Sequence, residues 1–168
     1  NVTLNFNHPV KELVWVHTNT ANATPGASTG NRWFNYAGCT SESDDVDSFT
    51  SALLQLNGHD RFDIQNGPYF NYVQPHQHHT RTPADGVNVY SFALNPEQHQ
   101  PSGTANLSRI DTTLLAVTYG DNLRGVRTPK LTSLFTNTLV YIFAFSYNVL
   151  RVMSGMGALL TPIRGNSE

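Results

Sequence analysis

The sequence predicts an all-β domain, an eight-stranded antiparallel sandwich with short helices only in its connections. Eight short apolar runs recur along the 168 residues, separated by clusters of Gly, Pro, Asn and Asp. Residues 87–92 place Val87 and Val89 on one face and Tyr90 and Phe92 on the other, which is the period of two that a strand shows. Short strands spaced by turn signals are typical of sandwiches, and 168 residues fit one domain with a substantial core.

The strand candidates occupy residues 2–6, 12–16, 52–56, 87–94, 104–110, 113–119, 138–152 and 157–161. The run 139–145 (LVYIFAF) has no polar interruption, so we expect a strand that is covered on both faces. From these runs we expect the core to contain Leu13, Trp15, Leu54, Val89, Leu107, Leu115, Phe143 and Val149.

Two short helices are expected in the long connections. Ser41 and Asp44 could frame a helix start within residues 41–50, because apolar side chains follow them at helical spacing. A second helix is expected over residues 67–73, where Pro68 suits the first helical position. Long connections in compact domains usually carry function or contacts. The polar segment 161–168 is expected to be a flexible tail.

Composition narrows the function classes. Only 13% of residues are charged, the net charge is −2, and the basic residues are scattered, so we expect no direct nucleic-acid binding. The single cysteine, Cys39, excludes an internal disulfide and a Cys-based zinc site. The longest apolar run is too short to cross a bilayer.

Residues 95–103 form a Pro-bounded polar loop between two strand candidates. Gln100-Pro101-Ser102-Gly103 has Pro and Gly where a type I turn favours them, which predicts a connection between strands 87–94 and 104–110. On the second of these expected strands Arg109 and Asp111 share a face, so they could pair with each other or with a neighbouring strand.

Several motifs suggest chemistry, but their spacing does not support it. His76, His78 and His79, with Glu97 and His99 later, suggest a metal site, yet Glu97 follows His79 by 18 residues and a loop intervenes. We therefore expect no metal and no cofactor. No nucleophile elbow, phosphate-binding loop or dinucleotide-binding pattern occurs, so we expect no enzyme activity. Three glycosylation sequons occur, at Asn1, Asn22 and Asn106, and Asn22 in a long connection is the best candidate.

Four segments resemble one family in the same order along the chain. They are FNHPVKELVWV (6–16), LQLNGHDRF with YFNYVQPHQHHT (54–62 and 69–80), YSFALNPEQHQPSGTANLSRID (90–111) and YNVLRVMSGMGALL (147–160). They resemble the double jelly-roll major capsid proteins of large nucleocytoplasmic DNA viruses, and together they look like the second, C-terminal jelly roll of such a protein.

This resemblance implies that residues 1–168 form a single jelly-roll domain with a structural role. The family forms homotrimeric, pseudo-hexagonal capsomers in an icosahedral shell over an internal membrane, with neighbouring capsomers and minor capsid proteins as partners. It implies a place in the virion, with assembly in the host cytoplasm. The loop 95–103 would lie at the inner end of the roll, and the connection 58–86 toward the outer end. The candidate assembly contacts are Glu97, Gln98, His99, Gln100, Arg109 and Asp111.

Two alternatives use the same fold class. One is a carbohydrate-binding jelly roll that stacks sugars on aromatic side chains, for which the candidates are Trp15, Trp33, Tyr36, Tyr69 and Phe70. Large aromatics more often fill sandwich cores, which favours the structural interpretation. The other is a cupin-like metalloprotein, which requires the histidines to converge on one ion.

Overall fold

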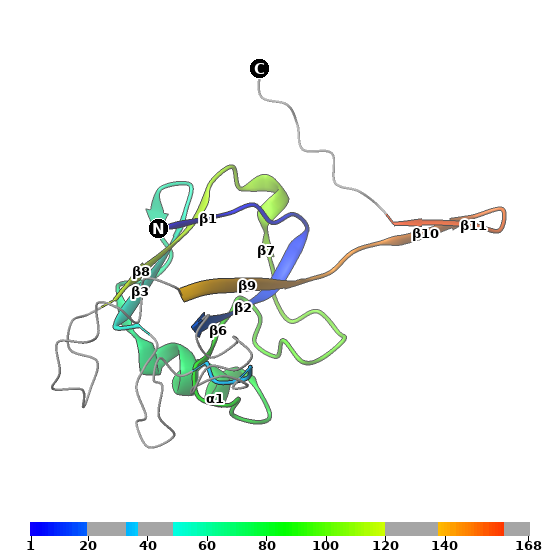
Figure 1. Cartoon of the computed structure of the whole chain (residues 1–168). Coiled ribbons are helices and arrows are strands. Elements are labelled where there is room, and N and C mark those ends of the chain that lie inside the picture. The colour runs from blue at the N-terminus through cyan, green and yellow to red at the C-terminus, as the bar shows by residue number, and fades with distance from the viewer. Residues whose placement is uncertain (20–32, 37–48, 120–137, 160–168) are drawn as a thin grey trace, which may run out of the picture.

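Two antiparallel sheets enclose the core of the chain (Figure 1). The computed structural model describes residues 1–19, 33–36, 49–119 and 138–159. In the described residues every strand pairing is antiparallel, and the helices are short. The all-β prediction is therefore confirmed.

The first sheet has the strand order β1 (Val2–Leu4), β8 (Thr113–Thr118), β3 (Ser51–Leu56) and β4 (His59–Asp60), with β5 (Gln65–Asn66) also paired to β3. The second sheet contains β6 (Val87–Ser91), β2 (Pro9–Asn19), β7 (Ala105–Asn106) and β9 (Thr138–Ser146). A separate hairpin consists of β10 (Leu150–Met153) and β11 (Met156–Leu159).

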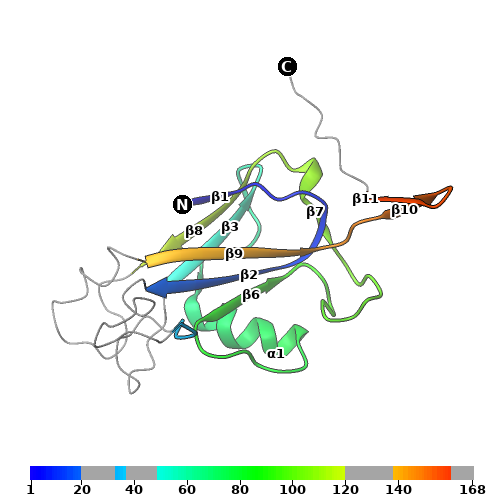
Figure 2. The same cartoon turned by 45° about the vertical axis from the view of Figure 1, so that its right-hand side comes forward.

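Strand β2 is the centre of the second sheet. It pairs with β9 over most of its length, and with β6 and β7 along its other edge, as Figure 2 shows. The register places Trp15 opposite Ile142 and opposite Asn88. A bulge at Lys11 interrupts the pairing with β9, and the Lys11 carbonyl accepts hydrogen bonds from the N–H groups of Phe92 and Ala93 at 2.9 and 3.2 Å. The bulge thus fixes the point where the chain leaves β6.

Two tight turns have the residues that their backbone requires. Asn57 and Gly58, with φ of 52° and 79°, join β3 to β4, and Ser154 and Gly155, with φ of 50° and 81°, join β10 to β11. Two successive positive φ values define the type I′ turn, whose twist matches that of the flanking strands. These turns explain why both hairpins are short and closed.

Two helical elements lie between β5 and β6. Tyr69–Val73 form a π-helical turn (η1) that continues into α1 (Gln74–His78), so the helix expected over residues 67–73 is confirmed and extends further. Most of the other expected helix, residues 41–48, lies outside the described residues, as do Cys39 and the segment 161–168. No helix in the described part of the chain is long and apolar enough to cross a membrane.

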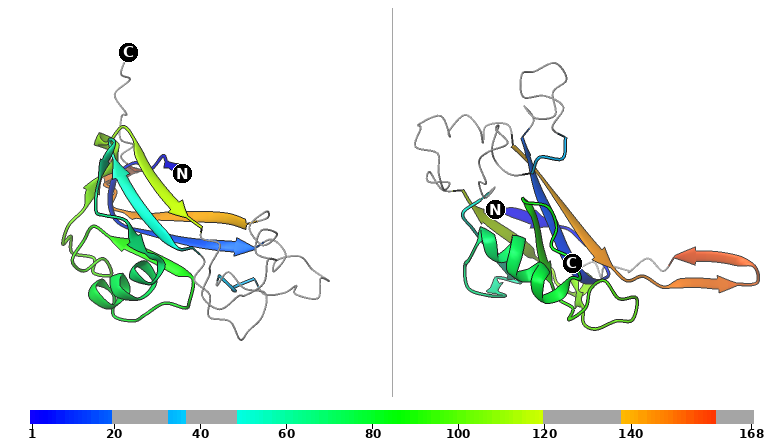
Figure 3. Two further views of the ribbon diagram at one scale, coloured as in Figure 1. Left: turned by 90° about the vertical axis from the view of Figure 1, so that its left-hand side faces the viewer. Right: turned by 90° about the horizontal axis from the view of Figure 1, so that it is seen from below.

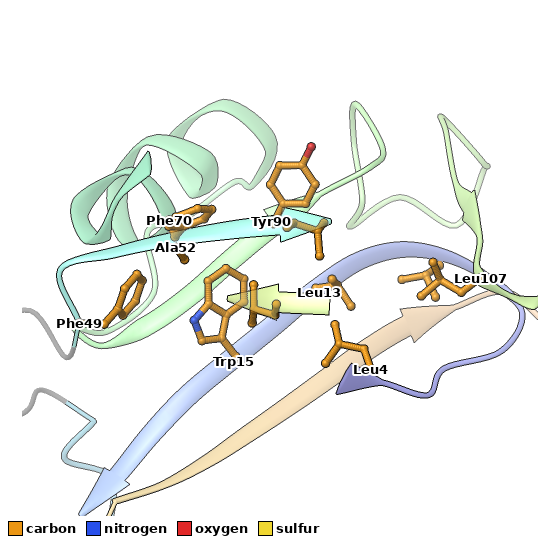
Figure 4. Packing of buried hydrophobic residues seen from close by; sticks show 11 residues of the cluster. Leu4, Leu13, Trp15, Phe49, Ala52, Phe70, Tyr90 and Leu107 are labelled. Atoms are coloured by element: carbon orange, nitrogen blue, oxygen red, sulfur yellow. The ribbon is translucent and has the colours of Figure 1, made fainter. Parts of the chain in front are cut away.

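The core lies between the two sheets and is rich in aromatic rings (Figure 4). Trp15 packs on Phe70 and Phe49 with ring centroids 5.1 and 6.3 Å apart, and Phe62 packs on Tyr90 at 4.8 Å. Six of the eight expected core residues are buried: Leu13, Trp15, Leu54, Val89, Leu107 and Leu115. Their apolar runs predicted this correctly, and all of them except Val89 belong to the hydrophobic cluster of the core.

The expectation for Phe143 and Val149 was wrong. Phe143 is 54% exposed and Val149 is 59% exposed. The strand 139–145 was expected to be covered on both faces, but only one face of β9, with Ile142 and Ala144, packs against the core. Val149 lies beyond β9, on the segment that leads to the β10–β11 hairpin. A continuous apolar run does not show what covers its second face, and here nothing in the described chain does.

Candidate assembly surface

The loop 95–103 is a closed unit with a fixed base. The Asn95 N–H donates to Ser102 Oγ at 2.9 Å, and Ser102 Oγ donates to the Asn95 carbonyl at 3.3 Å. Pro96 is fully buried, whereas Glu97, Gln98, His99 and Gln100 are exposed. The loop therefore connects β6 to β7 as predicted and presents four polar side chains to the outside.

The loop is also held from two sides. Glu97 Oε2 accepts a hydrogen bond from the Thr80 N–H at 3.0 Å, and the Leu94 carbonyl lies 2.9 Å from His78 Nδ1. The Tyr147 hydroxyl donates to the Gln98 carbonyl at 3.4 Å. Hydrogen bonds from Thr80, from its side chain first and its backbone second, together with the charge of His79, lower the pKa of Glu97. Contacts with the end of α1 and with the segment after β9 thus position this loop.

Arg109 and Asp111 do not form the strand pair that was expected. Strand β7 ends at Asn106, and Leu107–Arg109 form a 3-10 helical turn (η2). The Asn106 side chain caps this turn by accepting a hydrogen bond from the Ser108 N–H at 3.1 Å. The strand expected over residues 104–110 is therefore wrong beyond Asn106, because the Asn106 cap offers the backbone a turn in place of a sheet ladder. Arg109 and Asp111 are both exposed, on either side of Ile110.

The histidines of the PHQHH segment have separate environments. His76 is exposed on α1, His78 faces the Leu94 carbonyl, and His79 lies between two carboxylates. No group of three or more His, Cys, Asp or Glu in the described part of the chain has the arrangement of a metal site. The cupin-like alternative requires such convergence, and these residues do not provide it.

The structure does not favour the sugar-stacking alternative, because its main aromatic candidates pack in the core or against it. Trp15 and Phe70 are buried in the core, and Tyr69 packs edge-on against Phe70 with ring centroids 5.1 Å apart. Trp33 is exposed and Tyr36 is half-buried. The glycosylation candidate Asn22 lies outside the described residues.

Strand β9 has an apolar outer face that the sequence analysis did not predict. Its exposed side chains alternate along the strand, as one face of a strand requires, and they are Leu139, Tyr141, Phe143 and Phe145, between 47% and 54% exposed. By register Phe143 lies opposite Val14, which is half-buried, and Tyr141 lies opposite Val16, which is buried, so the exposed apolar face is confined to β9. Among the described residues β9 pairs only with β2, and its other edge is open.

The β10–β11 hairpin carries further exposed apolar side chains. Figures 1 and 3 show it projecting away from both sheets. Its exposed large apolar side chains are Leu150, Val152, Met153, Met156 and Leu159. Isolated two-stranded hairpins are marginally stable in water, and contiguous exposed apolar surface usually marks an interaction site. We call the outer face of β9 and this hairpin together the apolar flank.

Comparison with known proteins identifies a family. The family model described as the large eukaryotic DNA virus major capsid protein matches residues 1–158. The chain is 41% identical to the major capsid protein of Pyramimonas orientalis virus, covering 94% of this chain and 38% of that one. It is 39% identical to the major capsid protein of Paramecium bursaria Chlorella virus 1, covering 95% of this chain and 42% of that one.

Solved structures agree with the sequence matches. A chain of the PBCV-1 virus capsid superposes with a TM-score of 0.74 at 38% identity, covering 96% of this chain and 45% of that one. The Faustovirus major capsid protein shares the fold at 14% identity, with a TM-score of 0.61 over 86% of this chain and 31% of that one. The chain thus has the jelly-roll fold of these capsid proteins and spans less than half the length of the relatives named here. These relatives are structural proteins and not enzymes, and the chain belongs to the family of major capsid proteins of large eukaryotic DNA viruses.

Proposed function

We propose that this chain is the C-terminal jelly-roll half of a major capsid protein that builds homotrimeric, pseudo-hexagonal capsomers of an icosahedral shell. In this proposal the other half of the polypeptide, the two other subunits, neighbouring capsomers and minor capsid proteins supply its partners. The shell would enclose an internal membrane and assemble in the host cytoplasm. The role is structural, because the capsomer would be held together by the surface that is buried between folded units.

The observation that carries the proposal is the apolar flank. Four large side chains of β9 are about half exposed, and they lie on the face opposite the core. Burying apolar area contributes about 25 cal/mol per Å², so an uncovered row of this kind favours association. The matched PBCV-1 chain is more than twice as long as the matched segment, which supports the remainder of such a polypeptide as the unit that covers this face.

The loop 95–103 supports a second kind of contact. Its base is closed by Asn95 and Ser102, and its four exposed side chains can donate and accept hydrogen bonds. A loop that is already rigid loses less conformational entropy on binding. The loop is polar, exposed and fixed in shape, and these properties suit the rim of an interface between subunits or with a minor capsid protein. Arg109 and Asp111 remain exposed candidates on the following turn.

The flank is tested by replacing Tyr141 and Phe143 with Ser in the full-length capsid protein. We expect the variant to lose assembly of trimers, measured by light scattering and electron microscopy, while the isolated chain keeps its fold by circular dichroism. The matched control is Ile64→Ser, which removes an apolar side chain that is 66% exposed on the β4–β5 connection. Normal trimers from the double variant, or equal losses from the control, would overturn the assignment of the flank.

The loop is tested separately. Replacing Gln98, His99 and Gln100 with Ser or Gly leaves Glu97 and the Asn95–Ser102 closure in place, so the fold should be nearly as stable as before. We expect trimers or shells to form poorly from the full-length variant. Shells that assemble at the normal yield would show that the segment is only a strand connection.

A further inference from the structure

His79 lies between two carboxylates that come from distant parts of the chain. Its Nε2 is 2.9 Å from Glu12 Oε2 on β2, and its Nδ1 is 3.3 Å from Glu97 Oε1 on the loop 95–103. The side chains of Glu12 and His79 are 8% and 15% exposed, whereas that of Glu97 is 39% exposed. One ring therefore joins the central strand of a sheet to the loop.

The contacts of His79 with two carboxylates favour the protonated form of its imidazole ring. A neutral imidazole carries one N–H and one lone pair, so one of its nitrogens would turn a lone pair toward a carboxylate. An imidazolium has an N–H on both nitrogens and attracts both carboxylates. Glu12 Oε2 and His79 Nε2 are buried without an aligned hydrogen bond, so their close contact is an ion pair that depends on charge.

The groups that face His79 can be named from each neighbouring element. Glu12 faces it from β2, Glu97 from the loop, and from α1 its neighbour His78 turns its Nδ1 toward the Leu94 carbonyl. No basic side chain in the described residues forms a salt bridge with Glu12 or Glu97 other than His79. Loss of the ring proton therefore leaves two carboxylates near one another with no cation between them.

We propose that His79 is a proton-dependent latch that fixes the position of the loop 95–103 on the body of the domain. With the ring protonated, Glu97 is drawn to His79 and the loop lies against α1 and β2. With the ring neutral, the attraction between Glu97 and His79 is lost, and the loop is held less tightly, by the contacts of Thr80, His78 and Tyr147. The Asn95–Ser102 closure contains no titratable group, so the loop changes its position and not its internal shape.

The sign of the effect follows from which form the contacts favour. The latch stabilises the charged ring, so it is present at low pH, where an imidazole is protonated, and is lost at high pH, where an imidazole is neutral. Glu97 stays ionised over this range because its contacts with Thr80 and His79 lower its pKa. Histidine is the side chain whose ordinary titration falls between pH 5 and 8.

The test measures amide hydrogen exchange of residues 94–103 in the chain at pH 6 and pH 8, after correction for the intrinsic pH dependence of exchange. We expect the loop amides to be roughly tenfold less protected at pH 8, as the loss of one charge-assisted contact implies. His79→Gln, which cannot be protonated, should give equal protection at both pH values. His76→Gln, an exposed histidine on the same helix, should behave as the unchanged chain.

Two further measurements separate a latch from general unfolding. Protection of β3, residues 51–56, reports on the folded core and should not change in any variant. Glu97→Gln removes the partially exposed carboxylate alone and should abolish the pH dependence of the loop while leaving the core protected. A pH dependence that persists in His79→Gln or Glu97→Gln, or that is absent from the unchanged chain, would refute the latch. Because the readout is loop exchange within one chain, this result is independent of whether capsomers form.

Discussion

Gly103 ends the loop 95–103, and a single methyl group there tests how closely the loop packs against β6 and its following residues. Its φ is +146°, which side-chain-bearing residues rarely adopt. A Cβ added at this position would lie 2.9 Å from the Phe92 carbonyl oxygen and 3.3 Å from the Ala93 Cα. The N–H groups of Phe92 and Ala93 both donate to the Lys11 carbonyl, so this stretch of backbone cannot move freely.

The cost of Gly103→Ala can be estimated from these two facts. The unfavourable φ costs about 1–3 kcal/mol, and forcing an atom into a packed site costs about 1–3 kcal/mol more. Gly58 is the matched control, since its φ is +79° and a Cβ there would have no atom within 4 Å. Gly58→Ala should therefore cost only the left-handed strain of about 1–2 kcal/mol.

The assay is urea denaturation of both variants at neutral pH, followed by circular dichroism and extrapolated to water. We expect Gly103→Ala to lower the free energy of unfolding by about 2 kcal/mol more than Gly58→Ala, or about 4–8 °C in melting temperature. Equal losses in the two variants would show that the loop does not pack on Phe92 and Ala93, and the account of its fixed base would fail.

Three other outcomes follow from the same structure. Phe70→Ala should lower the free energy of unfolding by about 3–5 kcal/mol, because Phe70 is fully buried against Trp15. Val73→Ala on the same helical turn should change it by no more than about 1 kcal/mol. Denaturation curves of the two variants measure both values. Burial lowers the pKa of His17 to about 4, so below pH 6.5 the unfolded chain binds more protons than the folded chain. The free energy of unfolding should therefore fall by up to about 3 kcal/mol between pH 6.5 and pH 4. His17→Gln should remove that part of the pH dependence, and an unchanged pH profile in the variant would contradict the assignment. Phe143→Ser should cost less than about 1 kcal/mol in the chain alone, since 54% of the residue is already exposed, and a larger loss would mean that β9 is covered on its outer face within this chain.

The sequence predicted the parts of the fold that depend on local chemistry. Alternation in residues 87–92 and Pro68 before a helical turn matched the structure, and residues 95–103 do connect two strands, but the hydrogen-bonded turn lies at residues 95–98 and not at 100–103 as expected. In each case the deciding interaction lies within a few residues, so the pattern contains it. The burial of Leu13 and Trp15 also followed, because β2 is central and both of its edges are paired.

What the sequence did not reveal depends on partners that are distant or absent. An apolar run such as 139–145 shows that a strand is apolar but not which faces the rest of the chain covers, and Phe143 was misplaced for this reason. The strand predicted over 104–110 ended early because one side chain, Asn106, capped a helical turn. The pairing of His79 with Glu12 joins residues 67 positions apart, a contact that no local spacing indicates.

The pairing of β2 with β9 has a consequence for how the protein is made. Leu13 pairs with Ala144, so about 130 residues must be synthesised after Leu13 before its partner exists. At 5–20 residues per second, β2 waits roughly 6–25 s for the strand that closes its open edge. Strand β6 emerges earlier and can protect the opposite edge, but an apolar strand with one free edge is a template for wrong pairing. Slower synthesis of the residues after β2 should therefore lengthen the time during which this edge is open to wrong pairing.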